Sequence, residues 1–357
     1  MDPIERVNAV LNFKQPDRLP QCNFFSDGFI ETHGGLERNL YVEHGYELVP
    51  LFANISPSLY WQSIGEETDT DGTFIDGWGR TCRKTPSSGF IEVLEYSMNT
   101  LETLPRYDFD PYDLPERYER VSPGNLHHPK PFAEELEELK GKAFLVGNVY
   151  DPFETLARVI GLKNALMTMK SEPDKLKPVL NKFGTVMKEF GLAQIRYGGG
   201  GKLQGIWIWG DIAYTRGLMM APELYRELVL PALKNMCSAF KDEGVWVIYH
   251  TDGNPSEILG DLIDAGVSAL HTVEQVQGME LDTLIESYSN KLAFIGGIPP
   301  IKTGDADPLT TLKPTLSRMV KLGSSGGLIP GFTNFIHSNF DPELLKAITK
   351  FFEEKNY

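Results

Sequence analysis

The second part of the chain repeats one pattern, in which short apolar runs alternate with segments that carry helix signals. From about residue 143 the runs are "AFLVGNV", "GIWIWGD", "VWVIYH", "SALHTVE", "LAFIGGI" and "GGLIPGF". Their Val, Ile, Leu and Trp residues alternate little with polar ones, which is typical of strands buried on both faces of a parallel sheet. One intervening segment begins near Pro222 and stops at Gly244, as a helix would. The pattern predicts repeated βα units.

The length of 357 residues permits either two ordinary domains or one large α/β barrel. A barrel accounts for residues 1–357 as one domain. In the first 140 residues, "RLPQCNFF" and "ELVPLFA" have features of early strands. Residues 69–97 alternate polar and apolar side chains, which indicates an antiparallel insertion.

Charge and cysteine content exclude several classes of function. The net charge of -15 and the pI near 5.0 argue against a nucleic-acid partner, because binding phosphates requires clustered Lys and Arg. The cysteines are Cys22, Cys82 and Cys237, widely spaced and without a CxxC motif. They give neither a disulfide framework nor a cysteine-rich zinc motif. With no export signal and no long apolar segment, we expect a cytoplasmic protein without a membrane partner.

Polar residues stand where the apolar runs end. In an α/β barrel the catalytic groups lie at the carboxyl ends of the strands. The polar residues at these positions are Asp211, His250, Asp252, His271, Glu274, Asn334 and His337. Imidazoles and carboxylates that converge at one end of a barrel indicate a metal site or an acid/base site.

Structural roles remain open for several of these residues. His250 can be a histidine that satisfies a neighbour in the core, and Asp211 can cap a following helix. His271 lies within its run and can point into the barrel wall. Aromatic residues also fall at or just past the predicted strand ends, among them Phe25, Tyr150, Trp209 and Phe335. They predict either an aromatic pocket mouth or ordinary core packing.

Six segments in a fixed order resemble the uroporphyrinogen decarboxylase superfamily, which also contains cobalamin-linked methyltransferases. They include "ERVNAVLNFKQPDRLP", "HTDGN", "DAGVSALHTVE" and "LAFIGGIPP". The resemblance runs nearly end to end. It implies a single (β/α)8 TIM barrel, to which the sequence adds an N-terminal extension and the antiparallel insertion.

The resemblance is closer to the methyltransferase-like branch than to true uroporphyrinogen decarboxylase. The decarboxylases have an arginine-bearing segment after the first strand, whereas this chain has Asp27 there and no arginine between Arg18 and Arg38. Phe332 stands where their last-strand histidine would fall. The methyltransferases carry a zinc site with a His-x-Cys pair. His250 matches that histidine, and Asp252 stands where the cysteine belongs.

The resemblance therefore implies a methyltransferase that moves a methyl group between a small donor, such as a methyl ether, and a corrinoid protein or other acceptor. Zinc would be held by His250, Asp252 and Glu274. Replacing thiolates with a carboxylate would leave the metal more Lewis acidic and suited to O-demethylation. Without a metal, His250 and Asp252 would form an acid/base couple. We expect four catalytic residues, namely Asp211, His250, Asp252 and His337. We expect the substrate to be bound by Asp27, Phe25, Tyr150, Trp209, His271 and Asn334.

Two other functions stay open. One is cofactor-free decarboxylation of a tetrapyrrole, and the other is a non-catalytic subunit that binds or docks a corrinoid protein. The oligomeric state is also open, with a homodimer as one alternative.

Overall fold

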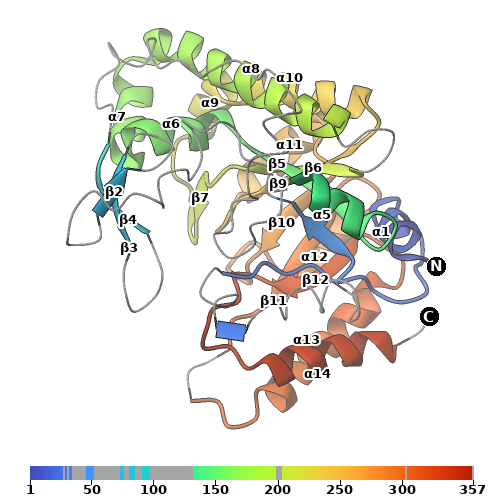
Figure 1. Ribbon diagram of the computed structural model, residues 1–357. Coiled ribbons are helices and arrows are strands. Elements are labelled where there is room, and N and C mark those ends of the chain that lie inside the picture. The colour runs from blue at the N-terminus through green and yellow to red at the C-terminus, as the bar shows by residue number, and fades with distance from the viewer. Residues whose placement is uncertain are drawn as a thin grey trace.

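The computed structural model describes residues 1–26, 29, 32–33, 46–51, 73–75, 80–84, 91–96, 132–197, 203–301 and 304–355. At its centre is a seven-stranded sheet in the order β1-β5-β6-β9-β10-β11-β12, with every pair of neighbours parallel (Figure 1). The strands are β1 (Leu48–Pro50), β5 (Phe144–Tyr150), β6 (Gly205–Trp209), β9 (Trp246–His250), β10 (Ala269–Val273), β11 (Ala293–Ile298) and β12 (Leu328–Phe332).

The apolar runs of the sequence form these strands. All residues of β5, β6, β10, β11 and β12 are buried, as expected for strands covered on both faces. The strands follow one another in space as they do in sequence, joined by helices. The prediction of an α/β fold built from parallel βα units is therefore confirmed.

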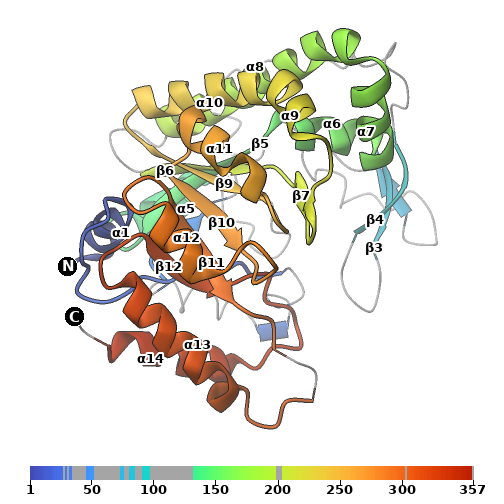
Figure 2. The ribbon, with the colours of Figure 1, turned by 180° about the vertical axis from the view of Figure 1, so that it is seen from behind.

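Helices separate the strands and cover the sheet. They are α1 (Pro3–Leu11), α5 (Phe132–Leu139), α6 (Pro152–Ile160), α7 (Leu162–Ser171), α8 (Pro173–Tyr197), α9 (Pro222–Leu228), α10 (Leu230–Asp242), α11 (Leu259–Ala265), α12 (Leu281–Ser287), α13 (Pro308–Gly323) and α14 (Pro342–Glu353). Helices α8 and α10 pack side by side, and α13 packs against α14 at the opposite end of the sheet (Figure 1). Helices α11 and α12 lie outside β9, β10 and β11 (Figure 2).

One predicted helix is divided in the structure. The segment from Pro222 to Gly244 forms α9 and α10, with a break at Val229. Pro231 has no backbone N–H and cannot continue the hydrogen-bond ladder of α9, which explains the break. Within the described residues, no helix combines the length and apolar content needed to cross a lipid bilayer.

Residues 21–25 link the two edge strands of the sheet. The carbonyl of Gln21 accepts from Glu47 N at 3.0 Å beside β1, and Cys22 N donates to the carbonyl of Pro330 in β12 at 3.0 Å. Gly331 permits this approach, because a Cβ atom there would lie 1.9 Å from the Cys22 carbonyl oxygen. We predicted a strand in "RLPQCNFF"; the structure has isolated bridges at Gln21 and Phe25.

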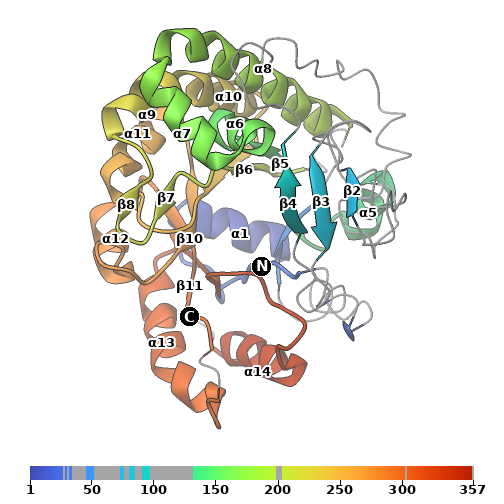
Figure 3. The same ribbon diagram turned by 90° about the vertical axis from the view of Figure 1, so that its left-hand side faces the viewer.

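The predicted antiparallel insertion is present as a separate three-stranded sheet (Figure 3). Its strands are β2 (Thr73–Ile75), β3 (Thr81–Lys84) and β4 (Ile91–Glu95). A second small element, the hairpin of β7 (Ala213–Tyr214) and β8 (Gly217–Leu218), follows β6 directly. This hairpin lies beside the polar residues described next.

Candidate metal site

Four adjacent strands place one residue each at the same level near their carboxyl ends. The sheet register pairs Tyr150 of β5 with Trp209 of β6, Trp209 with His250 of β9, and His250 with His271 of β10. Neighbouring residues at one level of a parallel sheet face the same side. Accordingly, the His250 ring centroid lies 4.6 Å from that of Trp209 and 4.8 Å from that of His271.

Two carboxylates converge on the imidazole of His250. Asp211 follows β6 and Asp252 follows β9, and their Oδ1 atoms lie 3.2 and 3.9 Å from Nε2 of His250. One ligand atom from each of the three residues lies within 4.8 Å of the other two. His250 is buried, whereas the two carboxylates are about half exposed. The arrangement combines one buried imidazole with two half-exposed carboxylate side chains.

The turn after β9 brings His250 and Asp252 to the same side. Gly253 has φ +77°, and a Cβ atom there would lie 2.4 Å from the backbone carbon of Tyr214. Only glycine fits this position, both for its conformation and for the close approach of the β7–β8 hairpin. Thr251 Oγ1 also accepts from Ile212 N at 3.2 Å, which ties the ends of β6 and β9 together.

The surroundings shift the pKa values of the Asp211 and Asp252 carboxylates in opposite directions. Burial alone would raise the pKa of Asp211, but the hydrogen bond and charge of His250, together with the charge of Arg158, lower the pKa overall. The pKa of Asp252 is raised to about 6, first by burial and then by the charges of Asp211 and Glu274, which outweigh the opposite effect of His250. Asp211 is therefore the more firmly ionised partner of His250.

His271 lies behind His250. Its side chain is buried, and its Nδ1 atom is 2.7 Å from Nδ1 of His250. Burial and the neighbouring His250 hold the pKa of His271 well below its usual range, so the ring is neutral. His271 contacts His250 and the rings of Phe24 and Trp207, and its predicted contact with substrate stays a prediction.

The converging group differs from the predicted ligand set in one carboxylate. We predicted His250, Asp252 and Glu274, whereas Asp211 completes the group within the described residues. The Oε2 atom of Glu274 accepts a hydrogen bond from Gly253 N at 3.1 Å and so supports the turn. For the acid/base couple without a metal we predicted His250 and Asp252, but Asp211 is the carboxylate closer to His250 Nε2. Asp211 is the second residue after β6, and its side chain reaches across to His250 of β9.

An aromatic wall, formed by Phe24, Trp209 and Phe335, lies beside His250. The ring of Phe24 lies 5.3 Å from that of Trp209 and 5.5 Å from that of Phe335, and Phe335 stacks on Trp209 at 6.4 Å. We predicted Phe25 here, but its ring packs against Phe29 at 5.0 Å. Consecutive residues of an extended segment point to opposite sides, and Phe24 is the one that faces the site.

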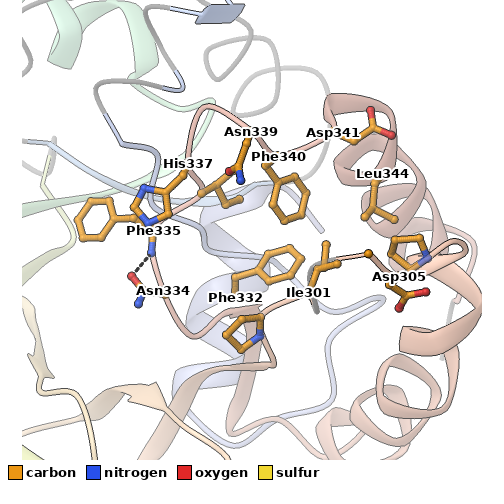
Figure 4. Close-up of a pocket in the computed structure, with 14 residues that line it drawn as sticks. Ile301, Asp305, Phe332, Asn334, Phe335, His337, Asn339, Phe340, Asp341 and Leu344 are labelled. Atoms are coloured by element: carbon orange, nitrogen blue, oxygen red, sulfur yellow. Dashed lines mark hydrogen bonds between the residues drawn. The ribbon is translucent and has the colours of Figure 1, made fainter. Parts of the chain in front are cut away.

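Asn334 and His337 line a cavity next to this wall. It has a volume of about 470 Å³ and lies between the loops after β11 and β12 and the start of α14. Figure 4 shows Phe332, Ile301 and Phe340 grouped together, and the rings of Phe335 and His337 next to each other and apart from this group. His337 lines this cavity and lies outside the converging group that is found among the described residues. Asp27, also predicted to bind substrate, lies outside the described residues.

The sequence interpretation missed Glu154 and Arg158 on α6. Asp151 caps this helix directly after β5, so its first turns return over the strand end. Arg158 lies 2.9 Å from Glu154 and places its guanidinium 4.3 Å from the ring centroid of Tyr150. Burial raises the pKa of Glu154, against the charge of Arg158. The Asp-Pro cap followed by an i,i+4 Glu–Arg pair is the signal in "DPFETLAR".

The donor set fits a divalent metal such as zinc. Catalytic zinc sites use imidazole and carboxylate ligands and leave one position for water or substrate, and a ligating histidine usually has its second nitrogen hydrogen-bonded. Asp211, His250 and Asp252 supply the ligands, the half-exposed carboxylates leave an open side, and His271 is bonded to the second nitrogen. A metal site at this position is consistent with both the ligand types and their support.

Known proteins share this fold and part of this sequence. No curated protein sequence matches the chain significantly. Among solved structures, a methyltransferase from Methanosarcina mazei matches with a TM-score of 0.69 and 16% sequence identity, covering 99% of this chain and 99% of that one. At this identity the similarity establishes the fold. The family model of uroporphyrinogen decarboxylase (URO-D) matches residues 101–354. The chain therefore belongs to the uroporphyrinogen decarboxylase family.

Proposed function

We propose that the chain is a methyltransferase that moves a methyl group between a small donor, such as a methyl ether, and a corrinoid protein or other acceptor. The observation that carries this proposal is the convergence of Asp211, His250 and Asp252 within 4.8 Å at the ends of β6 and β9. A zinc ion bound there would supply a Lewis acid that polarises the donor oxygen. The fold shared with a methyltransferase supports the same reaction class.

The chain's own residues would bind and orient the donor. The aromatic wall of Phe24, Trp209 and Phe335 offers an apolar surface beside His250 and excludes water from it. Asp211, ionised and 3.2 Å from His250 Nε2, fixes that imidazole toward the open side. His337 and Asn334, which line the cavity beside the aromatic wall, carry N–H groups that would donate hydrogen bonds to a departing oxygen atom.

Further parts of the proposal concern the whole molecule. We infer that residues 21–25 occupy the position of the eighth strand of a (β/α)8 barrel. Their hydrogen bonds to both edge strands of the sheet support this inference. A corrinoid protein as partner, a cytoplasmic location and a homodimer stay predictions. The acidic net charge of -15 supports partners other than nucleic acid.

Cofactor-free decarboxylation is the second candidate, and the Asp211–His250 pair favours it. A carboxylate 3.2 Å from an imidazole is a workable acid/base couple without any metal. The non-catalytic alternative is less compatible with half-exposed carboxylates converging on a buried histidine.

Zinc content and methyl transfer test the proposal together. Protein purified without chelator or nickel resin is analysed for metals and then assayed with cob(I)alamin and a set of aryl methyl ethers. In the wild-type protein we expect about one zinc per chain and consumption of cob(I)alamin. The His250→Ala variant should lose both, whereas the His337→Ala variant should retain the zinc. A protein that binds no zinc and transfers no methyl group, but releases carbon dioxide from a porphyrinogen, would replace this function with the second candidate.

A further inference from the structure

The two buried histidines constrain each other through one short contact. His250 Nδ1 and His271 Nδ1 lie 2.7 Å apart, a distance at which two nitrogens share one hydrogen and not two or none. The backbone ladder holds them there, since Thr251 N donates to the carbonyl of His271 at 2.8 Å. Whichever ring donates, the other must accept, so the two tautomers are linked.

The group that faces His250 Nε2 decides the direction of this hydrogen bond. When Nε2 carries the single ring proton, that proton is directed to Asp211, whose Oδ1 atom lies 3.2 Å away, and His250 then accepts at Nδ1 from His271. When Nε2 instead coordinates a cation, the proton of His250 must be on Nδ1, and His271 must accept it. With one proton on each ring, the pair holds two protons in both arrangements, so no net change in protonation is required.

We propose that His271 is the positioning residue of this site: it reverses its hydrogen bond to His250, from donor to acceptor, when a divalent cation binds at His250 Nε2. This inference rests on the metal site of the proposed function. His271 is suited to it, because it makes no other side-chain hydrogen bond within the described part of the chain, so its Nε2 is able to take up the second proton.

A carboxylate or a carbonyl in place of His271 would only accept. Metal-ligating histidines are commonly fixed by such one-way acceptors, which favour the metal-binding tautomer permanently. A neutral histidine supports both states of His250. In the metal-free protein it directs the Nε2 proton to Asp211, and in the loaded protein it leaves Nε2 bare for the ion. The site is therefore ordered before the metal arrives.

Nitrogen NMR of the histidine rings tests this directly. With histidine labelled with ¹⁵N, long-range spectra distinguish the two tautomers of each ring. In the metal-free protein we expect the proton of His250 on Nε2 and that of His271 on Nδ1. After addition of zinc sulfate, both should change to the other nitrogen. An unchanged His271 in a protein that has taken up zinc would overturn the proposal.

Two substitutions separate the hydrogen bond from packing. In His271→Gln the side-chain amide can donate or accept by rotation, whereas in His271→Phe the ring can do neither. We expect zinc affinity to fall by about 10–100-fold in the Phe variant and to stay within a few-fold in the Gln variant. Trp207→Phe is the control for packing, because Trp207 contacts the ring of His271 at 4.7 Å without a hydrogen bond to it. Equal losses in all three variants would show a purely structural role.

These readouts also separate this inference from the proposed function. A wild-type protein that binds no zinc would contradict the metal site and the cation-bound half of the inference. The spectrum of the metal-free protein would still test the tautomers that we expect for His250 and His271 without a cation, since this measurement requires neither zinc nor methyl transfer. Zinc-driven exchange of the tautomers without methyl transfer would support His271 and reject the reaction.

Discussion

The Oδ1 atom of Asp211 lies 3.2 Å from Nε2 of His250, and this pair connects the ends of the neighbouring strands β6 and β9. The contact makes Asp211, and not Glu274, the carboxylate closest to the imidazole. It also defines the open side of the site, where Asp252 stands 3.9 Å from the same nitrogen.

Asp211→Asn should lower zinc affinity by at least about tenfold, because it replaces a charged ligand with a neutral one. Glu274→Gln should change affinity only a few-fold, since the amide oxygen can still accept from Gly253 N. Isothermal titration with zinc sulfate compares the two variants. A larger loss in Glu274→Gln than in Asp211→Asn would restore the ligand set expected from the sequence.

Gly253→Ala should destabilise the protein by more than about 1 kcal/mol, because a side chain is unfavourable at φ +77° and its Cβ would meet the Tyr214 backbone at 2.4 Å. Gly260→Ala is a matched control, because Gly260 lies within α11 with open space around its Cβ position. That variant should be unchanged or more stable by about 0.5–1 kcal/mol. Denaturant unfolding measures both, and comparable stability of the two variants would reject the argument.

Asp151→Asn should reduce the loss of stability that we expect on raising the pH. Burial raises the pKa of Asp151 to about 7, above the value of an unfolded Asp. The folded state therefore binds more protons than the unfolded state between about pH 4 and 7, and the free energy of unfolding falls across that range as pH rises. The slope contributed by one such group approaches about 1.4 kcal/mol per pH unit.

Asparagine removes this titration and keeps the hydrogen bonds. Its carbonyl can still accept from Glu154 N, and its amide can donate to Tyr249, whose hydroxyl then donates to the Gly210 carbonyl. Denaturant unfolding at several pH values gives the difference in free energy of unfolding between the wild type and the variant. The contributions of other titrating groups, such as Glu47, cancel in this difference. A constant difference from pH 5 to 8 would show that the pKa of Asp151 is not raised.

Phe335→Ala should weaken binding of an apolar donor while leaving the fold intact. Phe335 is 40% exposed and stacks on Trp209. Removing its ring should therefore remove contact with the donor and leave the core packing largely unchanged. An aromatic contact of about 1 kcal/mol predicts an increase in KM of about fivefold, with little change in kcat. Met167→Ala, on the exposed face of α7, is the control. Unchanged KM in Phe335→Ala would place the donor elsewhere.

The repeated apolar runs determined much of the fold. Each run from residue 143 onward became a buried parallel strand, because an uninterrupted series of Val, Ile, Leu and Trp is stable only between two covering layers. The residues that end these runs identified His250, Asp211 and Asp252 as neighbours, since the carboxyl ends of parallel strands meet at one edge of a sheet. These conclusions follow from periodicity and position alone.

Only the tertiary structure decided how these residues are paired. Register across β9 and β10 placed His271 behind His250, and the tight turn at Gly253 occupied the carboxylate of Glu274, leaving Asp211 to face the imidazole. Likewise, Phe24 and not Phe25 reached the site because of the path of a segment that forms only isolated bridges, with Tyr46 and Ile336. Apolar periodicity is local along the chain, whereas the direction of each polar side chain depends on contacts between strands distant in sequence.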